Sequence, residues 1–144
     1  MIEFKEATYD AGIEVLRNLR GPQRRTIEKL RLDAPRLLKQ AIGNGFPNFC
    51  AYVGGSPAAI FGGHAESLLG ETRLWMLTTG LVESHKVPLL RYSRRFVKAM
   101  FEAYGPVIGA CDVEFRESEA WLRWLGFKEV SRGEYIIMRY SGGH

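Results

Sequence analysis

The sequence predicts a single α/β (α+β) domain built on a mixed, mostly antiparallel sheet with helices on both faces. Its 144 residues, 46% hydrophobic and 25% charged, are typical of one globular domain spanning residues 1–144. The apolar segments 49–53 and 57–65 are joined by Gly54-Gly55, a hairpin signal that requires antiparallel pairing. The segments 71–79 and 107–113 are separated by a long helical pattern, and such a crossover requires a parallel pair.

The N-terminal third is expected to hold one strand and three short helices. Residues 2–7 alternate between apolar and charged side chains, which indicates a strand with one face against a core. Asp10 offers an N-cap for a helix over 13–19, where apolar residues recur at three-residue spacing until Gly21-Pro22. Two more helical stretches are expected, at 27–32 and 36–42.

A meander, a long helix and two further strands complete the chain. The segment 71–79 follows the 49–65 hairpin as a third strand, and Pro88 then lies in the first turn of a long helix that Gly105-Pro106 ends. The apolar face of this helix comprises Leu89, Tyr92, Phe96, Met100 and Tyr104. The remaining expected elements are a strand at 107–113, a short helix at 118–125 and a strand at 134–140.

The net charge of +4 is concentrated in two basic blocks. The first basic block, residues 17–39, has eight basic side chains against Glu28 and Asp33. The second, residues 86–98, has five basic side chains and no acid. Because the rest of the chain is net acidic, this pattern favours a localised site for an anion, although most basic helix faces are simply solvated.

The few cysteines and histidines argue against a metal or disulfide framework. Cys50 and Cys111 each lie inside an apolar run, the context of a small buried hydrophobe, and the three histidines are scattered. Residues 1–8 do not resemble a secretory leader, and no apolar run reaches the ~18 residues of a membrane span. We therefore expect a cytosolic protein without a metal.

The segment Trp121-Leu122-Arg123-Trp124-Leu125-Gly126-Phe127 resembles the short helix and Leu-Gly-Phe ending of the GNAT superfamily, the acetyl-CoA-dependent N-acetyltransferases. The expected element order agrees with that family over nearly the whole chain. Together with Trp75-Met76-Leu77 and the helix segment 90–95, the same segment is similar to small GNAT-like proteins of short-tailed bacteriophages, a group that includes internal virion proteins.

The resemblance implies a cofactor site where the 71–79 and 107–113 strands splay apart. The pantetheine arm of acetyl-CoA is expected to pair with the backbone of Met76, Leu77 and Thr78. The pyrophosphate is expected at the start of the long helix, where free N–H groups and the helix dipole favour anions. This chain has only Gly80 where the family has a glycine-rich loop, so the side chains expected to bind phosphate directly are Ser84, Lys86 and Arg91.

The resemblance also locates the catalytic positions. The tyrosine that protonates the leaving thiolate in many members is replaced by Leu122, which cannot donate a proton. Three alternatives follow: another donor serves, with Tyr92 and Ser118 as the candidates by neighbourhood, the thiolate leaves with the help of solvent, or the chemistry is absent. Candidate bases for the acceptor amine are His64, Glu66, Glu71 and Asp112. Asp112 ends an apolar strand, where burial would raise its pKa, but it could equally cap the helix that follows.

Two functions from different classes remain open. The first is transfer of acetyl from acetyl-CoA to an amine of a host protein or a small molecule, in the host cytoplasm. The second is a catalytically inactive GNAT scaffold that acts as an internal virion or host-interaction protein, with an acidic host protein expected at the first basic block. Nucleic-acid binding has the least support because no basic-aromatic motif accompanies the charge, and Trp121 and Trp124 are expected to be core residues.

Overall fold

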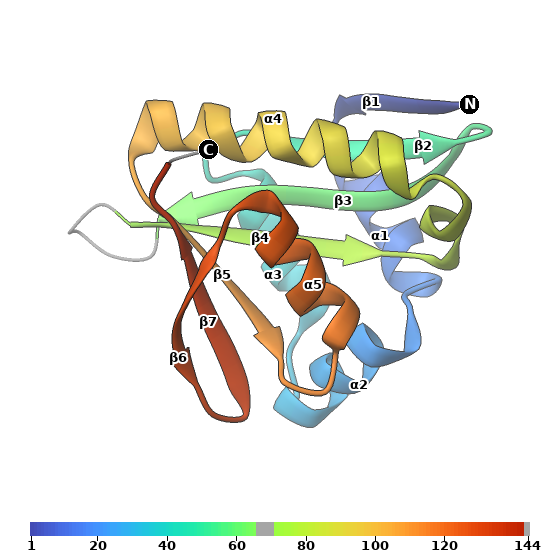
Figure 1. The fold of residues 1–144 in the computed structure, drawn as a ribbon. Helices are drawn as coiled ribbons and strands as arrows, with labels where there is room; N and C mark the ends of the chain where they lie inside the picture. The colour runs from blue at the N-terminus through green and yellow to red at the C-terminus, as the bar shows by residue number, and fades with distance from the viewer. Residues whose placement is uncertain (66–70, 143–144) are drawn as a thin grey trace. The chain divides into compact units, whose positions relative to one another are not determined.

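The computed structural model describes residues 1–65 and 71–142, which form two compact units. The first unit comprises residues 1–63 and 75–89, and the second comprises 64–74 and 90–144, each with its own packing. The elements are β1 (Ile2–Glu6), α1 (Tyr9–Arg17), α2 (Gly21–Leu30), α3 (Ala34–Ile42), β2 (Asn48–Val53), β3 (Ser56–Ala65), β4 (Thr72–Thr78), the 3₁₀ helix η1 (Gly80–Ser84), α4 (Lys86–Tyr104), β5 (Val107–Asp112), α5 (Arg116–Leu125), β6 (Lys128–Arg132) and β7 (Tyr135–Tyr140) (Figure 1).

The strands form one mixed sheet in the order β1-β2-β3-β4-β5-β7-β6. β1 pairs antiparallel with β2, and β2 with β3, as the hairpin signal at Gly54-Gly55 predicts. β5 and β6 both pair antiparallel with β7. β4 and β5 are the parallel pair, with Thr72 opposite Val107 and Arg73 opposite Ile108. The predicted mixed, mostly antiparallel sheet is therefore confirmed.

The core of the first unit lies between the β2–β3 hairpin and helices α1 and α3. Val15 of α1 and Leu38 of α3 are buried together with Cys50 and Ile60 of the two strands. Gly12 allows the two helices to approach, because a Cβ at that position would press into the side chain of Leu38. α2 differs from its neighbours, since none of its described residues is buried.

The core of the second unit lies between the β5–β7 pair and the apolar faces of α4 and α5. Tyr140 of β7 packs edge-on against Phe101, with ring centroids 5.6 Å apart, and lies 5.7 Å from Phe127. Leu122 is buried over Gly109, where a Cβ would lie 3.0 Å from a Leu122 methyl group. The position at which the family resemblance expects a tyrosine is thus a core leucine here.

Two helix starts differ from the prediction. Thr8, not Asp10, is the N-cap of α1, because its Oγ1 accepts a hydrogen bond from the Ala11 N–H at 3.2 Å. Gly21-Pro22, predicted to end the first helix, is instead where α2 begins. Proline is compatible with this position because the N–H groups of the first helical turn have no partner within the helix.

The C-terminal region contains a strand that the sequence pattern did not predict. α5 begins at Arg116, two residues before the predicted start, and β6 then pairs with β7. All five residues of β6 are exposed, and the pairing register shifts between Glu129 and Ser131. No apolar alternation marks such a strand, which explains why periodicity missed it.

Within the described residues, no helix is both long enough and apolar enough to cross a membrane.

Candidate functional site

The backbone of β4 has two hydrogen-bonding edges, one that faces β3 and one that faces away from β3. The Thr79 N–H donates to the Ala58 carbonyl of β3 at 2.8 Å, whereas the Thr72 N–H donates to the Pro106 carbonyl, on the β5 side, at 3.2 Å. Successive residues of a strand direct their N–H and C=O groups to opposite edges. Met76 and Thr78 therefore direct theirs to the edge that faces away from β3, which the family resemblance expects to bind the pantetheine arm.

The side chain of Gln23 occupies this edge. Its Nε2 donates to the Met76 carbonyl at 3.2 Å, and its Oε1 accepts from the Thr78 N–H at 2.8 Å and from the Thr78 hydroxyl at 3.1 Å. In a parallel ladder, one residue of the neighbouring strand donates to residue i−1 and accepts from residue i+1. The Gln23 carboxamide makes this same pair of bonds around Leu77, so it takes the place of a strand residue.

The chain just before α2 completes the occupation of the edge. The Arg20 N–H donates to the Thr78 carbonyl at 3.1 Å, and Leu19 forms an antiparallel bridge with Thr79. Both backbone groups of Thr78 are therefore bonded to the segment 19–23. This segment belongs to the first basic block, whose role the sequence left open.

The loop expected to hold the pyrophosphate carries an acidic side chain between two basic ones. Glu83 of η1 forms ion pairs with Arg20 at 2.7 Å and with Lys86 at 3.3 Å. Arg20 is the more buried partner, with 17% of its side chain exposed against 50% for Glu83 and for Lys86. The carboxylate of Glu83 thus takes a position at the start of α4 that would suit an external anion.

The same loop is otherwise held by local bonds. Thr79 caps η1 by accepting from the Leu81 N–H at 3.2 Å, and the Ser84 hydroxyl lies 2.9 Å from His85 Nδ1. Gly80 has open space where a Cβ would lie, so no neighbour in the described part of the chain requires a glycine there. The predicted phosphate ligands Ser84 and Lys86 therefore lie in one loop, each already paired with a neighbour.

Comparison with solved structures identifies the architecture. The ribosomal-protein-S18-alanine N-acetyltransferase from Escherichia coli matches with a TM-score of 0.75 at 13% identity, over 98% of this chain and 94% of that one. A probable acetyltransferase from Staphylococcus epidermidis matches with a TM-score of 0.76 at 12% identity, over 99% and 100%. A GNAT-family acetyltransferase from Streptococcus pneumoniae gives 0.67 at 12% identity, over 99% and 100%.

The chain has the GNAT fold. No protein-family model matches the sequence, and no curated protein matches it. At these identities the structural likeness establishes the fold alone. The GNAT fold predicted from the Leu-Gly-Phe helix and the element order is therefore confirmed.

Within the GNAT fold, the residues predicted to bind cofactor fall into two groups. Met76, Leu77 and Thr78 lie on β4, where the polar edge groups of Met76 and Thr78 already bond to Gln23, and Leu77 packs on the core of the first unit. Arg91 is exposed in the second turn of α4. Two neighbouring residues of the second basic block, Arg94 and Arg95, lie over the aromatic rings of Trp124 and Tyr92.

Arg94 of α4 makes a cation–π contact and a hydrogen bond with Trp124 of α5. The Arg94 guanidinium lies 4.0 Å from the centroid of the Trp124 ring and donates to the Trp124 carbonyl at 3.1 Å. Trp124 is 43% exposed, so the prediction of a core tryptophan is wrong at this position. A cation over an aromatic face gains from the ring quadrupole while both remain accessible to solvent.

The candidate bases have three different environments. Asp112 is half-buried, and its Oδ1 accepts from the Glu114 N–H at 2.9 Å, so it organises the turn before α5 while Phe115 is the N-cap. Glu71 is ion-paired with Arg139 of β7 at 2.9 Å. His64 is half-buried on β3, and the fourth candidate, Glu66, lies outside the described residues.

Tyr92 and Ser118, the two residues predicted as substitute proton donors, lie on different helices. Tyr92 is half-buried on α4, and burial raises its pKa above the usual tyrosine value, against an opposing effect of the nearby Arg95 charge. A tyrosine hydroxyl, whose ordinary pKa is about 10, carries its proton at neutral pH, and a raised pKa makes it a weaker acid. Ser118 is at the N-terminal turn of α5, with its N–H donating to the Phe115 carbonyl.

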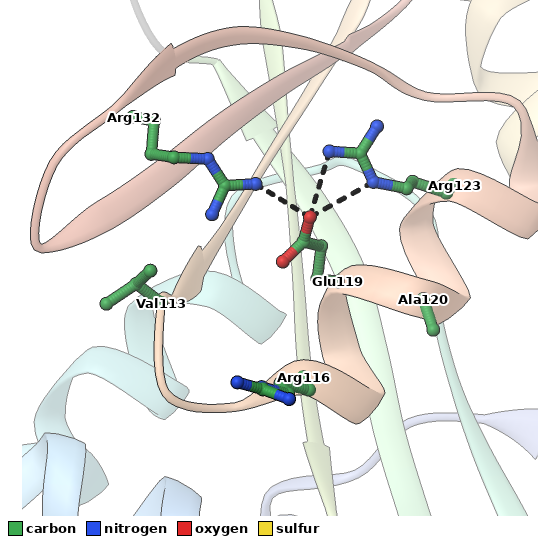
Figure 2. Close-up of a pocket in the computed structure, with 6 residues that line it drawn as sticks. All are labelled: Val113, Arg116, Glu119, Ala120, Arg123 and Arg132. Carbon is green, nitrogen blue, oxygen red and sulfur yellow. Dashed lines mark hydrogen bonds and ion pairs between the residues drawn. The ribbon is translucent and has the colours of Figure 1, made fainter.

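A cluster of arginines and glutamates that the sequence analysis did not single out lies in the second unit. Figure 2 shows Glu119 of α5 between Arg123 and Arg132. These three side chains line an open hollow of about 350 Å³. Glu119 Oε2 accepts from Arg123 Nη2 at 2.8 Å and from Arg132 Nη2 at 2.7 Å. These hydrogen bonds, from Arg123 first and then Arg132, lower the pKa of Glu119. The i, i+4 spacing of Glu119 and Arg123 could have indicated half of the cluster.

Proposed function

We propose that this protein is an N-acetyltransferase of the GNAT type that binds acetyl-CoA along the edge of β4 that faces away from β3. The observation that carries the proposal is that the Met76 carbonyl and the Thr78 N–H bind one carboxamide at the same time. Such a pair of groups selects an extended amide chain, because each amide brings one donor and one acceptor. The pantetheine arm contains amides of this kind.

The fit of the phosphate region is partial. Lys86 at the start of α4 and Arg91 one turn later would bring two positive charges to a pyrophosphate, but Glu83 now neutralises part of that charge. We propose that Lys86 and Arg91 hold the phosphates once Glu83 is displaced. Bound acetyl-CoA supplies the acetyl group as a thioester.

The residues of the chain would then serve the acceptor. A nitrogen–carbon bond forms at the acceptor amine and the carbon–sulfur bond of the thioester breaks, so the amine must lose a proton and the thiolate must gain one. We propose Tyr92 as the donor. For the base that removes the proton from the amine, we favour Asp112 or His64 over Glu71, because protonation of Glu71 would break its ion pair with Arg139.

The acceptor is proposed to be an amine of a host protein or of a small molecule. An acidic protein partner would contact the first basic block, whose exposed residues include Arg25, Lys29 and Arg36. The similarity to phage GNAT-like proteins supports this choice and a location in an infected host's cytoplasm.

A second function is favoured by one specific observation. Leu122 takes the position of the proton donor that is usual in the family, and it is buried in the core. A leucine side chain has no proton to donate. This supports a catalytically inactive GNAT scaffold serving as an internal virion or host-interaction protein.

Calorimetric titration with acetyl-CoA distinguishes the two functions. We expect saturable binding, and we expect Arg91→Ala to weaken it roughly tenfold, as loss of a charge-assisted phosphate contact does, with little effect of Lys98→Ala on the same helix. Transfer of labelled acetyl to proteins or amines of a host lysate should follow and should be lost in Tyr92→Phe. Absence of heat at millimolar acetyl-CoA would overturn the proposal, and binding without transfer would favour the inactive scaffold.

A further inference from the structure

The polar edge of β4 is bonded to the chain's own side chains at the positions where the proposed function requires acetyl-CoA. Gln23 supplies an amide to Met76 and Thr78, and Glu83 supplies an anion to Arg20 and Lys86. These two groups match, in kind and in order along β4 and η1, the amide arm and the phosphates of the cofactor. We propose that Arg20, Gln23 and Glu83 form a latch that competes with acetyl-CoA and must open before it binds. This inference rests on the proposed function.

The hydrogen bonds of Gln23 are incompatible with a second amide at the same atoms. The Thr78 N–H has one hydrogen, and it points at Gln23 Oε1 at 2.8 Å. The Thr78 carbonyl accepts from Arg20 and the Met76 carbonyl from Gln23. A ligand that pairs with this edge therefore has to displace the carboxamide.

The element that carries Gln23 can be released at low cost. None of the described residues of α2 is buried, and Ile27 is its one residue among the partly buried hydrophobics packed against the core of the first unit. α2 also begins without a side-chain N-cap bond. Segments with few buried apolar contacts open with smaller free energies than the core does, so α2 can move while the β2–β3 hairpin stays folded.

Glu83 couples the two ends of the latch. Its carboxylate joins Arg20, whose backbone N–H bonds to Thr78, to Lys86 at the start of α4. An arriving pyrophosphate would draw Arg20 and Lys86 away from Glu83, which would weaken the hold on the segment 19–23. The latch thus gives the phosphates a means of releasing the edge that the amide arm needs.

The test compares cofactor binding by Gln23→Ala and Gln23→Asn with that by the wild type. Both variants free the Met76 carbonyl and the Thr78 N–H, since alanine has no carboxamide and the asparagine side chain, one methylene shorter, does not reach them. Because the hydrogen bonds of Gln23 to Met76 and Thr78 no longer compete, we expect acetyl-CoA to bind roughly tenfold or more tightly by calorimetry. Gln40→Ala is the matched control, because Gln40 is the exposed glutamine of the neighbouring helix α3.

Hydrogen exchange provides a readout that does not depend on the cofactor. The Thr78 amide should exchange faster in Gln23→Ala than in wild type, whereas amides of β2 should be unchanged, which would also show that the variant is folded. In the wild type, acetyl-CoA should increase exchange in α2 as it displaces the latch.

Three results would overturn the inference. Equal affinity of wild type and Gln23→Ala would remove the competition while leaving the proposed function standing. Weaker binding by Gln23→Ala would make Gln23 a contact for the cofactor rather than its competitor. Failure of both proteins to bind would overturn the latch and the proposed function together.

Discussion

At the scale of single residues, the interactions that define the site were invisible to sequence patterns. Gln23 bonds to Thr78 across 55 positions, and a lone polar side chain on an exposed helix has no periodicity that announces such a bond. The cofactor positions Met76 and Thr78 could be named only through the family resemblance, and their partner could not be named at all. The same holds for Glu119 and Arg132, which are 13 positions apart.

The Glu119 cluster predicts a dependence of stability on pH. Hydrogen bonds from Arg123 and Arg132 lower the pKa of Glu119, and those from Arg132 and Arg123 lower that of Glu129. A carboxyl whose pKa is lower in the folded state stabilises the fold above its unfolded value of about 4.3, and that contribution is lost as pH falls through the folded value. The urea midpoint of the wild type should therefore drop between pH 5 and pH 3 by more than that of Glu119→Gln.

A matched control separates this cluster from the general effect of acid. Glu102→Gln removes an exposed carboxylate from α4 and should retain the full pH dependence of the wild type. Because the cluster is exposed, added salt should also shrink the difference between wild type and Glu119→Gln. Identical pH profiles for wild type and Glu119→Gln would show that the hydrogen bonds from the two arginines to Glu119 do not contribute to the pH dependence of stability.

At the scale of elements, sequence reasoning succeeded where apolar side chains mark a buried face. The long helix with Pro88 in its first turn, the hairpin at Gly54-Gly55 and the parallel pair of β4 and β5 are all confirmed. It failed at β6, whose residues are all exposed, because such a strand forms through backbone pairing with β7 and not through burial. The predicted start of α1 was wrong because Thr8 and Asp10, two positions apart, are both residue types that can cap a helix.

The close contact between α1 and α3 predicts that a methyl group added at Gly12 destabilises the fold. A Cβ at Gly12 would press into Leu38, which is 3% exposed and has little room to move. Overpacking of this kind costs ~1–3 kcal/mol, and the better helix propensity of alanine offsets up to ~1 kcal/mol. Gly12→Ala should therefore lower the free energy of unfolding by about 1–2 kcal/mol in urea titrations.

A double variant tests whether Leu38 is the cause. Leu38→Val removes a methylene group from the contact, so Gly12→Ala combined with Leu38→Val should be less destabilised than the sum of the single variants. Gly80→Ala serves as the control, since its Cβ would meet open space, and it should change stability by less than ~0.5 kcal/mol. Additive losses in the double variant would contradict the proposed contact.

At the scale of the whole molecule, the chain passes between its two compact units more than once. β4 and α4 each contribute residues to both units, so neither element can unfold without affecting both. Each unit also contains one buried free cysteine, Cys50 in the first and Cys111 in the second. The two thiols can therefore report on the units separately.

The shared elements predict that the two thiols become reactive together. Burial raises the pKa of Cys50 to about 11 and also raises that of Cys111, so both react slowly with thiol reagents in the folded protein, since the thiolate is the reactive form. In increasing urea, the labelling rates of the two cysteines, measured on their separate peptides by mass spectrometry, should rise with the same midpoint. Labelling of Cys50 at urea concentrations that leave Cys111 protected would show instead that the first unit opens alone. Hydrogen exchange in α2 would then have to be compared with exchange in the rest of the first unit, to separate the release of α2 from unfolding of the whole unit.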